Sequence, residues 1–124
     1  MDVAQFAEEA FRRDSQIRFV GLIDYDFHIV YSKMREGIAS VTTEKQDRDF
    51  IQLMPPILVE AAEKMQPVLG RVESATIRYE KVLLVFFRVN SVVVLLSFDP
   101  SVTTPFMSAL SGLIARDLGL KYLT

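Results

Sequence analysis

Residues 71–98 read RVESATIRYEKVLLVFFRVNSVVVLLSF and contain three short apolar runs separated by two polar breaks. In the first run, residues 71–79, the odd-numbered and even-numbered residues differ in polarity, which indicates a strand with one less apolar face. The second run, Val82–Phe87, and the third, Val92–Leu96, are apolar at every position, so both faces of those strands must be covered. The stretch predicts a β-meander whose two later strands lie inside a sheet with helices on both faces.

The first third of the chain predicts a helix followed by a hairpin. Residues 3–13 carry apolar side chains at helical spacing, with charged side chains on the other side. Residues 17–23 form a β-rich apolar run, and residues 27–34 form a more polar one. The turn-forming sequence Asp24-Tyr25-Asp26 lies between them. We therefore expect an amphipathic helix and two strands, the second of which lies at an edge of the sheet.

The middle of the chain predicts a helix that two prolines interrupt. Thr43 followed by Gln46 is the pattern of a capping box, and helical spacing continues to Met54. Because a proline inside a helix removes a hydrogen bond, Pro55-Pro56 predicts a kink or two helices. We expect the second helix to span Pro56 to Met65 and to end at Gln66-Pro67.

The end of the chain predicts one more helix. Asp99-Pro100 stops the last strand, and Thr104 with Pro105 is typical of a helix cap and first turn. Gly119 fits a C-terminal stop. The expected apolar face consists of Phe106, Ala109, Leu110, Leu113, Ile114 and Leu118.

These elements occur in the order α-β-β-α-β-β-β-α, without an internal repeat or a linker, and predict one domain over residues 1–124. Strands joined by short connections pair antiparallel, and the strands that are apolar on both faces belong in the middle. The fold class is therefore α/β (α+β): a three-layer α/β/α sandwich with a five-stranded antiparallel sheet of strand order 2-1-5-4-3. The terminal helices would cover one face and the middle segment the other.

Composition excludes several classes of protein. The chain has no cysteine, which excludes disulfides, thiolate catalysis and zinc fingers. The net charge of -2, without a basic stripe, gives no sign of nucleic-acid binding. Its apolar runs are too short to span a membrane, and its N-terminus lacks the pattern of a signal peptide. We expect a cytoplasmic protein.

No catalytic signature stands out, so we expect no enzymatic activity and no cofactor. Asp24, Asp26 and His28 share a parity and resemble a set of metal ligands, but aspartate is common in turns and one histidine makes a poor transition-metal site. His28 has no nucleophile-turn sequence near it, and no glycine pattern for binding phosphate occurs. We expect neither a metal site nor a base at His28.

Three stretches carry a resemblance to a known family: residues 17–24 (IRFVGLID), 70–87 (GRVESATIRYEKVLLVFF) and 95–100 (LLSFDP). With the order of elements, they make the chain similar to the roadblock/dynein light chain family, in particular to small archaeal roadblock-like proteins. More widely, the chain resembles profilin-like and longin-like sandwiches. The resemblance implies a non-catalytic scaffold that forms a homodimer and binds or regulates a small Ras-like GTPase or another signalling partner.

The resemblance also implies where the homodimer forms. In that family the edge strand of the meander joins its symmetry mate, and the middle helices pack together. Pro55-Pro56 inside the middle helix departs from the family pattern. The interface residues implied here are Arg71, Glu73, Ala75, Ile77 and Tyr79 on the edge strand and Phe50, Met54 and Ile57 on the middle helix.

Two alternatives remain open at the level of sequence. The edge strand offers unpaired backbone groups, but Arg71, Arg78 and Lys81 can instead blunt it. The second alternative is a small-molecule-sensing domain with an apolar pocket between sheet and helices, whereas simple core packing explains the same side chains. The side chains in question are Phe86, Phe87, Phe98, Met54 and Met65.

Overall fold

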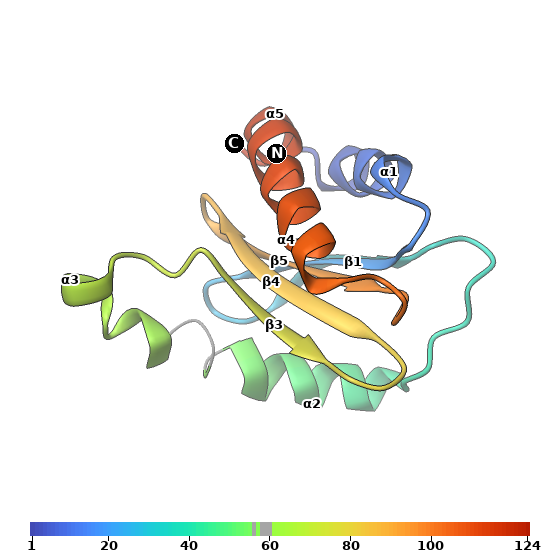
Figure 1. Cartoon of the computed structure of the whole chain (residues 1–124), viewed down its shortest axis with the longest axis horizontal. Helices are drawn as coiled ribbons and strands as arrows, with labels where there is room; N and C mark the ends of the chain where they lie inside the picture. Colours follow the sequence, from blue (N-terminus) through green and yellow to red (C-terminus); the bar gives the residue numbers. More distant parts are fainter. Residues whose placement is uncertain (56, 58–60) are drawn as a thin grey trace.

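The computed structural model, which describes residues 1–55, 57 and 61–124, contains one antiparallel sheet of five strands in the order β2-β1-β5-β4-β3. Helices lie on both faces of this sheet (Figure 1). The predicted strand order and the three layers are confirmed. The strands are β1 (Ile17–Asp24), β2 (Ile29–Met34), β3 (Ser74–Arg78), β4 (Leu83–Val89) and β5 (Val92–Phe98).

The central strand β5 has no exposed side chain, because β1 and β4 flank it and helices cover both of its faces. Its alternate residues enter two separate cores. Val94 and Leu96 face the terminal helices, whereas Val93 and Leu95 face the middle segment. The continuous apolar runs of the sequence thus correspond to strands that are buried on both sides.

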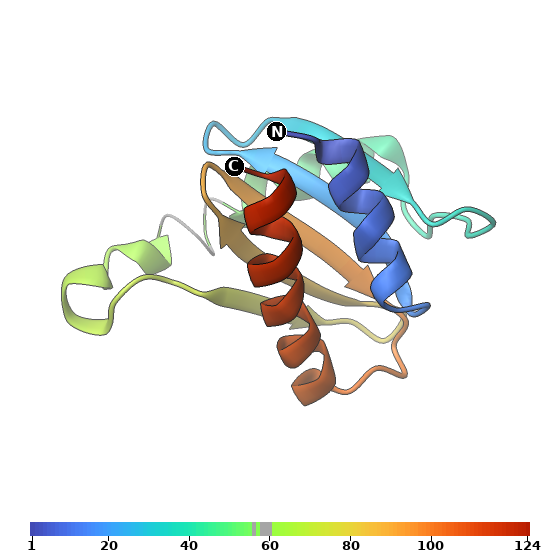
Figure 2. The same cartoon turned by 90° about the horizontal axis from the view of Figure 1, so that it is seen from above.

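Two helical segments from the ends of the chain cover one face of the sheet. They are α1 (Val3–Arg13) and a continuous helix that consists of α4 (Thr104–Leu113), the π-helical turn η2 (Ile114–Gly119) and α5 (Leu120–Tyr122). Figure 2 shows them side by side above the strands. Phe6 of α1 and Met107 of α4 are fully buried in the larger core.

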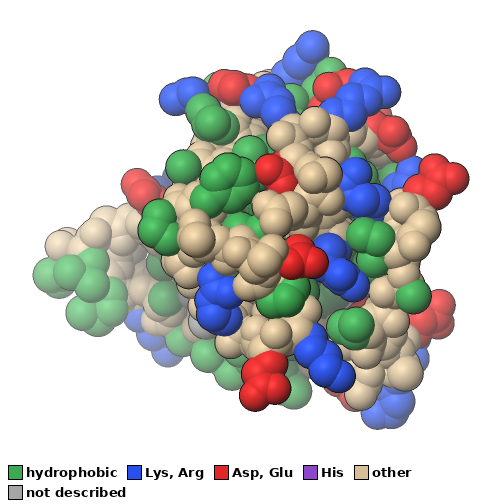
Figure 3. Space-filling view, turned by 45° about the vertical axis from the view of Figure 1, so that its right-hand side comes forward, with side chains coloured by type: hydrophobic (Ala, Val, Ile, Leu, Met, Phe, Trp, Pro, Cys, Tyr) green, Lys and Arg blue, Asp and Glu red, His purple; other side chains and the backbone are tan. Residues whose placement is uncertain are grey.

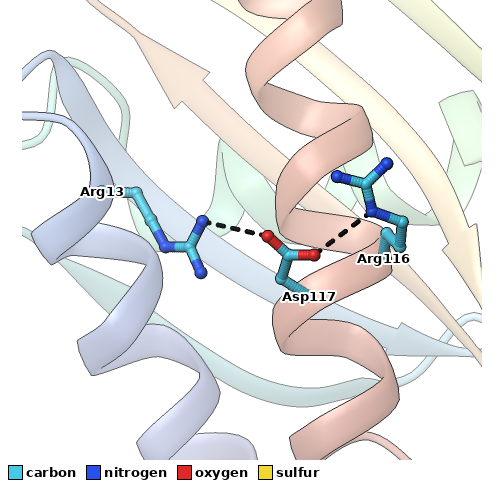
Figure 4. Close-up of polar contacts among 3 residues, drawn as sticks. All are labelled: Arg13, Arg116 and Asp117. Atoms are coloured by element: carbon cyan, nitrogen blue, oxygen red, sulfur yellow. Dashed lines mark hydrogen bonds and ion pairs between the residues drawn. The ribbon is translucent and has the colours of Figure 1, made fainter.

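An exposed cluster of ions links these two helices (Figure 4). Arg13 Nη1 of α1 lies 3.4 Å from Asp117 Oδ2, and Arg116 Nε lies 3.2 Å from Asp117 Oδ1. The hydrogen bond from Arg116 is the largest of the effects that lower the pKa of the Asp117 carboxyl. Exposed pairs of this kind contribute little to stability, so packing against the sheet is what holds the helices in place.

The final helix differs from the prediction in its cap and in its buried face. The cap is Thr103 rather than Thr104, and its hydroxyl accepts the Phe106 N–H at 3.4 Å. Phe106 and Leu113, predicted to be buried, are 44% and 41% exposed, and Ala109 of the predicted face is exposed as well. Apolar residues lie around most of this helix, so spacing alone did not define the face that meets the sheet. That face consists of Met107, Leu110, Ser111, Ile114, Leu118 and Gly119.

The middle helix α2 (Glu44–Pro55) covers the opposite face of the sheet. The predicted capping box is present: the Thr43 N–H donates to Gln46 Oε1 at 2.9 Å, and the Gln46 N–H donates to Thr43 Oγ1 at 3.1 Å. None of the described helices is long and apolar enough to cross a lipid bilayer.

The predicted helix from Pro56 to Met65 lies partly outside the described residues, which exclude Pro56 and residues 58–60. Its described part ends at Glu63, a few residues before the predicted stop at Gln66-Pro67. These two residues also begin a short helix that was not predicted, α3 (Gln66–Leu69). A proline in the first turn removes no helical hydrogen bond, so it is compatible with a helix start.

The prediction that Gly119 ends the final helix is wrong. Gly119 is instead a site of close approach between this helix and β4. The backbone remains helical through Tyr122, and a Cβ added at Gly119 would lie 2.6 Å from Val89 Cγ1. The hydrogen atom of glycine is what allows the helix to lie this close to the sheet.

We predict that Gly119→Ala lowers the free energy of unfolding by about 1–3 kcal/mol, because the added methyl group forces the helix and Val89 apart. Gly112→Ala is the matched control. It lies on the same helix with nothing within 4 Å of an added Cβ, and it should raise stability by about 0.5–1 kcal/mol. Urea unfolding followed by circular dichroism measures both values. Equal stability of Gly119→Ala and the wild type would contradict the close packing.

Candidate protein-interaction surface

Strand β3 forms an edge of the sheet, since its one neighbour among the described strands is β4. Just beyond the strand, the Tyr79 N–H donates to the Val82 carbonyl at 2.8 Å. Because backbone groups of a strand alternate in direction, Ala75 and Ile77 direct their N–H and C=O groups toward β4 as well. Ser74, Thr76 and Arg78 therefore direct theirs toward the open side, where a further strand can pair.

The Arg78 side chain does not hinder strand pairing at this edge, because it is hydrogen-bonded to the segment that follows β5. Its guanidinium donates to the carbonyls of Pro100 and Val102 at 3.1 and 2.9 Å and to the Thr104 hydroxyl at 3.2 Å. These bonds fix the segment that leads from β5 into α4. Three cationic residues could have blocked pairing at this edge. Two of them, Arg71 and Lys81, lie outside the strand.

The other edge strand, β2, carries a charged pair that joins it to α1. Lys33 Nζ lies 2.8 Å from Glu8 Oε1. This hydrogen bond lowers the pKa of the Glu8 carboxyl and raises the pKa of the Lys33 ammonium. An edge that bears a lysine fixed in this way is less suited to pairing than β3.

The predicted interface residues fall into three groups. Ala75 and Ile77 lie in β3, half-buried on the face that α2 covers, whereas Tyr79 lies beyond the end of the strand. Arg71 and Glu73 precede the strand and are exposed.

On the middle helix, Phe50 packs inside the protomer, with its ring stacked on Phe86 at a centroid distance of 5.9 Å. Met54 is half-buried, and Ile57 is 58% exposed. The outward apolar residue of α2 is Leu53, which is 63% exposed and which sequence reasoning missed. The helical spacing of Phe50, Ile51 and Met54 placed Leu53 off the core face and could have revealed it.

A groove of about 630 Å³ lies between α2 and the sheet, at the end where β3 turns into β4. Apolar side chains dominate its walls, including Phe50 and Ile51 from the helix and Leu84 and Leu95 from the sheet. Its rim includes residues 40–42 and 79–82. Figure 3 shows charges of both signs interspersed with hydrophobic groups over one face, without a basic field.

The segment after α2 projects from the body of the protein as an arm, which we define as residues 61–72 and which includes α3 (Figure 1). Val68 and Leu69 of the arm are 79% and 74% exposed, more than any other large hydrophobic side chain described. Hydrophobic groups are visible on this projection in Figure 3. Sequence reasoning did not single out either residue.

The structure brings Asp24, Asp26 and His28 together, with their ligand atoms within 4.8 Å of one another. One Asp24 oxygen, Oδ1, accepts the N–H groups of Asp26 and His28 at 2.9 and 3.0 Å. The carboxylate therefore shapes the turn, as the sequence interpretation held.

These features define the class of protein: a small antiparallel α/β/α sandwich whose edge strand β3 has outward backbone groups without a partner among the described residues. No family model and no curated protein matches the sequence. Solved structures show that the fold is that of the Roadblock/LC7 domain. A Streptomyces avermitilis Roadblock/LC7 domain has a TM-score of 0.71 at 8% identity, and the alignment covers 100% of each chain.

The gliding protein MglB from Thermus thermophilus is similar at a TM-score of 0.74 and 15% identity, over 97% of this chain and 87% of that chain. A structure of MglB with a tetrameric arrangement is similar at a TM-score of 0.72 and 14% identity, over 97% of this chain and 87% of that chain. The predicted roadblock-like architecture is thereby confirmed as a fold. The archaeal subgroup stays a prediction.

Proposed function

We propose that this chain is a non-catalytic, cytoplasmic interaction module that forms a homodimer and binds or regulates a small Ras-like GTPase. The observation that supports it most directly is the open edge of β3, whose outward backbone groups lie at Ser74, Thr76 and Arg78. The roadblock fold and the resemblance to that family support the kind of partner. The tetrameric arrangement of a similar MglB supports assembly through more than one copy.

In the proposed dimer, the β3 strands of two copies pair antiparallel across a two-fold axis. Residues that lie opposite each other in an antiparallel pair share a face of the sheet, so the axis passes beside a single residue of β3. Thr76 is the middle residue of the strand. A register centred on it continues the sheet from one protomer into the other.

We predict that Thr76→Pro converts the dimer into a monomer without unfolding it, since proline removes an N–H that points away from β4. The dissociation constant of the dimer should rise at least about ten-fold. Light scattering during size-exclusion chromatography measures the mass, and circular dichroism checks the fold. Ile77→Pro is the contrasting variant: its lost N–H points toward β4, so it should destabilise the protomer itself. A wild-type chain that is monomeric at high concentration would contradict the proposed pairing of β3.

We predict that a tagged copy purified from its native cells retains a small Ras-like GTPase, in an amount that changes when GTP is added. The chain has no phosphate-binding glycine motif of its own, so any nucleotide dependence must come from the partner. A tagged Thr76→Pro variant, which should be monomeric, is purified in parallel. The amount of GTPase that it retains, compared with the wild type, tests whether the partner binds the dimer. Recovery of no GTPase in either nucleotide state would contradict the proposal.

The groove between α2 and the sheet favours a second candidate, a small-molecule-sensing domain. Its volume of about 630 Å³ falls in the range of ligand sites, and its walls are mostly apolar. A metabolite that binds there should raise the melting temperature, since a ligand at 100 times its Kd stabilises by about 2.7 kcal/mol. A thermal-shift screen measures this, and the absence of any stabilising metabolite would count against this candidate.

A further inference from the structure

Two unpartnered apolar surfaces lie at opposite ends of the sheet but on the same side of it. The groove opens beside the β3–β4 turn at residues 79–82. The arm begins at the other end, beside the β4–β5 turn, where Glu63 pairs with Arg88 of β4. Leu84, which lines the groove, and Arg88 lie four residues apart on one strand, so both point to the face covered by α2.

The base of the arm is held in place by a half-buried polar cluster. The side chains of Glu63 and Arg88 are 20% and 18% exposed. Arg88 Nε also donates to the Tyr25 hydroxyl at 2.8 Å, and that hydroxyl donates to the Asn90 carbonyl at 2.7 Å. The base of the arm therefore lies against β4, at the end of the sheet next to the β4–β5 turn.

Beyond Glu63, the large apolar side chains of the arm are mostly exposed to solvent. Met65, Val68 and Leu69 are 51%, 79% and 74% exposed. The chain returns toward β3 at Gly70, which has a φ of 82°. The apolar tip of the arm thus lies a few residues before the strand that forms the open edge.

The pairing proposed for β3 brings these two surfaces together, and this step rests on the proposed function. With Thr76 at the two-fold axis, Glu73 of one copy lies opposite Tyr79 of the second copy. The second copy turns back into β4 just after Tyr79, where the Tyr79 N–H donates to the Val82 carbonyl. The arm, which ends at Val72, therefore leads toward the turn at residues 79–82 of the second copy, and this turn belongs to the rim of the groove. A two-fold axis perpendicular to the sheet also keeps the α2 faces of both copies on the same side.

We propose that the arm of each protomer docks its apolar tip, Met65, Val68 and Leu69, in the groove between α2 and the sheet of the other protomer. The exchange is reciprocal, so each dimer contains two identical arm–groove contacts. The apolar walls of the groove match the apolar tip of the arm.

The size of the proposed β3 contact supports a second contact of this kind. A stable protein–protein interface buries roughly 1,200–2,000 Å² in total. β3 has only five residues, and the side chains of Ser74 and Thr76, whose backbone groups point outward, are small and polar. Two docked arms add the apolar, well-packed area that a five-residue strand pair lacks.

The test uses the absence of native cysteines. Gln66→Cys on the arm and Lys81→Cys on the groove rim are prepared separately, mixed, and treated with a short bismaleimide. The expected result is a covalent dimer in the mixture but in neither variant alone, because symmetry places like positions at opposite ends of the dimer. Thr76→Cys, which lies beside the two-fold axis, reports on β3 pairing independently.

The outcomes separate this inference from the proposed function. Cross-linking of Thr76→Cys without cross-linking in the mixture overturns the arm exchange and leaves β3 pairing intact. Failure of both cross-links overturns both. Cross-linking in the mixture at a level no higher than between Gln66→Cys and Ser32→Cys, an exposed site on β2, also overturns the exchange.

A second pair of variants tests the apolar contact itself. Val68→Asp with Leu69→Asp should raise the dissociation constant of the dimer at least about ten-fold, while the melting temperature of the protomer stays the same because both side chains are exposed in it. Leu120→Asp, at an exposed leucine of α5, is the matched control and should leave the dimer unchanged. An unchanged dissociation constant for the double variant overturns the proposal.

Discussion

The burial of β5 and β4 on both faces is the constraint on which the rest of the structure depends. Val92–Phe98 contains no exposed residue, and β4 is buried at five of its seven positions. Strands of this kind are stable in water only between two covering layers. The terminal helices provide one layer and α2 the other, so one sheet divides the interior into two cores.

The same constraint leaves the outer strands as the places where backbone groups can meet another chain. The two edges are treated differently. Lys33 on β2 is paired with Glu8 of α1, whereas the backbone of β3 is open and its arginine is turned back onto the β5–α4 connection. This asymmetry is the reason why β3 rather than β2 is the edge used in the proposed dimer.

The two faces of the sheet are covered to different extents. The larger core is closed by two helical segments that pack side by side, whereas among the described residues the smaller core is covered by α2 and retains a groove beside it. The arm, residues 61–72, does not fill this groove but projects at the far end of the sheet. Apolar surface that remains exposed in this way usually marks a site of interaction.

The sequence by itself determined the strand order, the layers and the capping box at Thr43, because side-chain periodicity and local turn chemistry encode these features directly. The predictions that Gly119 ends the last helix and that Phe106 and Leu113 are buried were wrong, since both depend on which side of the helix meets Val89. Only the tertiary structure decided the groove, the projection of the arm, and the use of Arg35, whose guanidinium donates to carbonyls of Phe11, Asp14 and Ile17. These features join residues that are distant along the chain, so no local pattern of side chains specifies them.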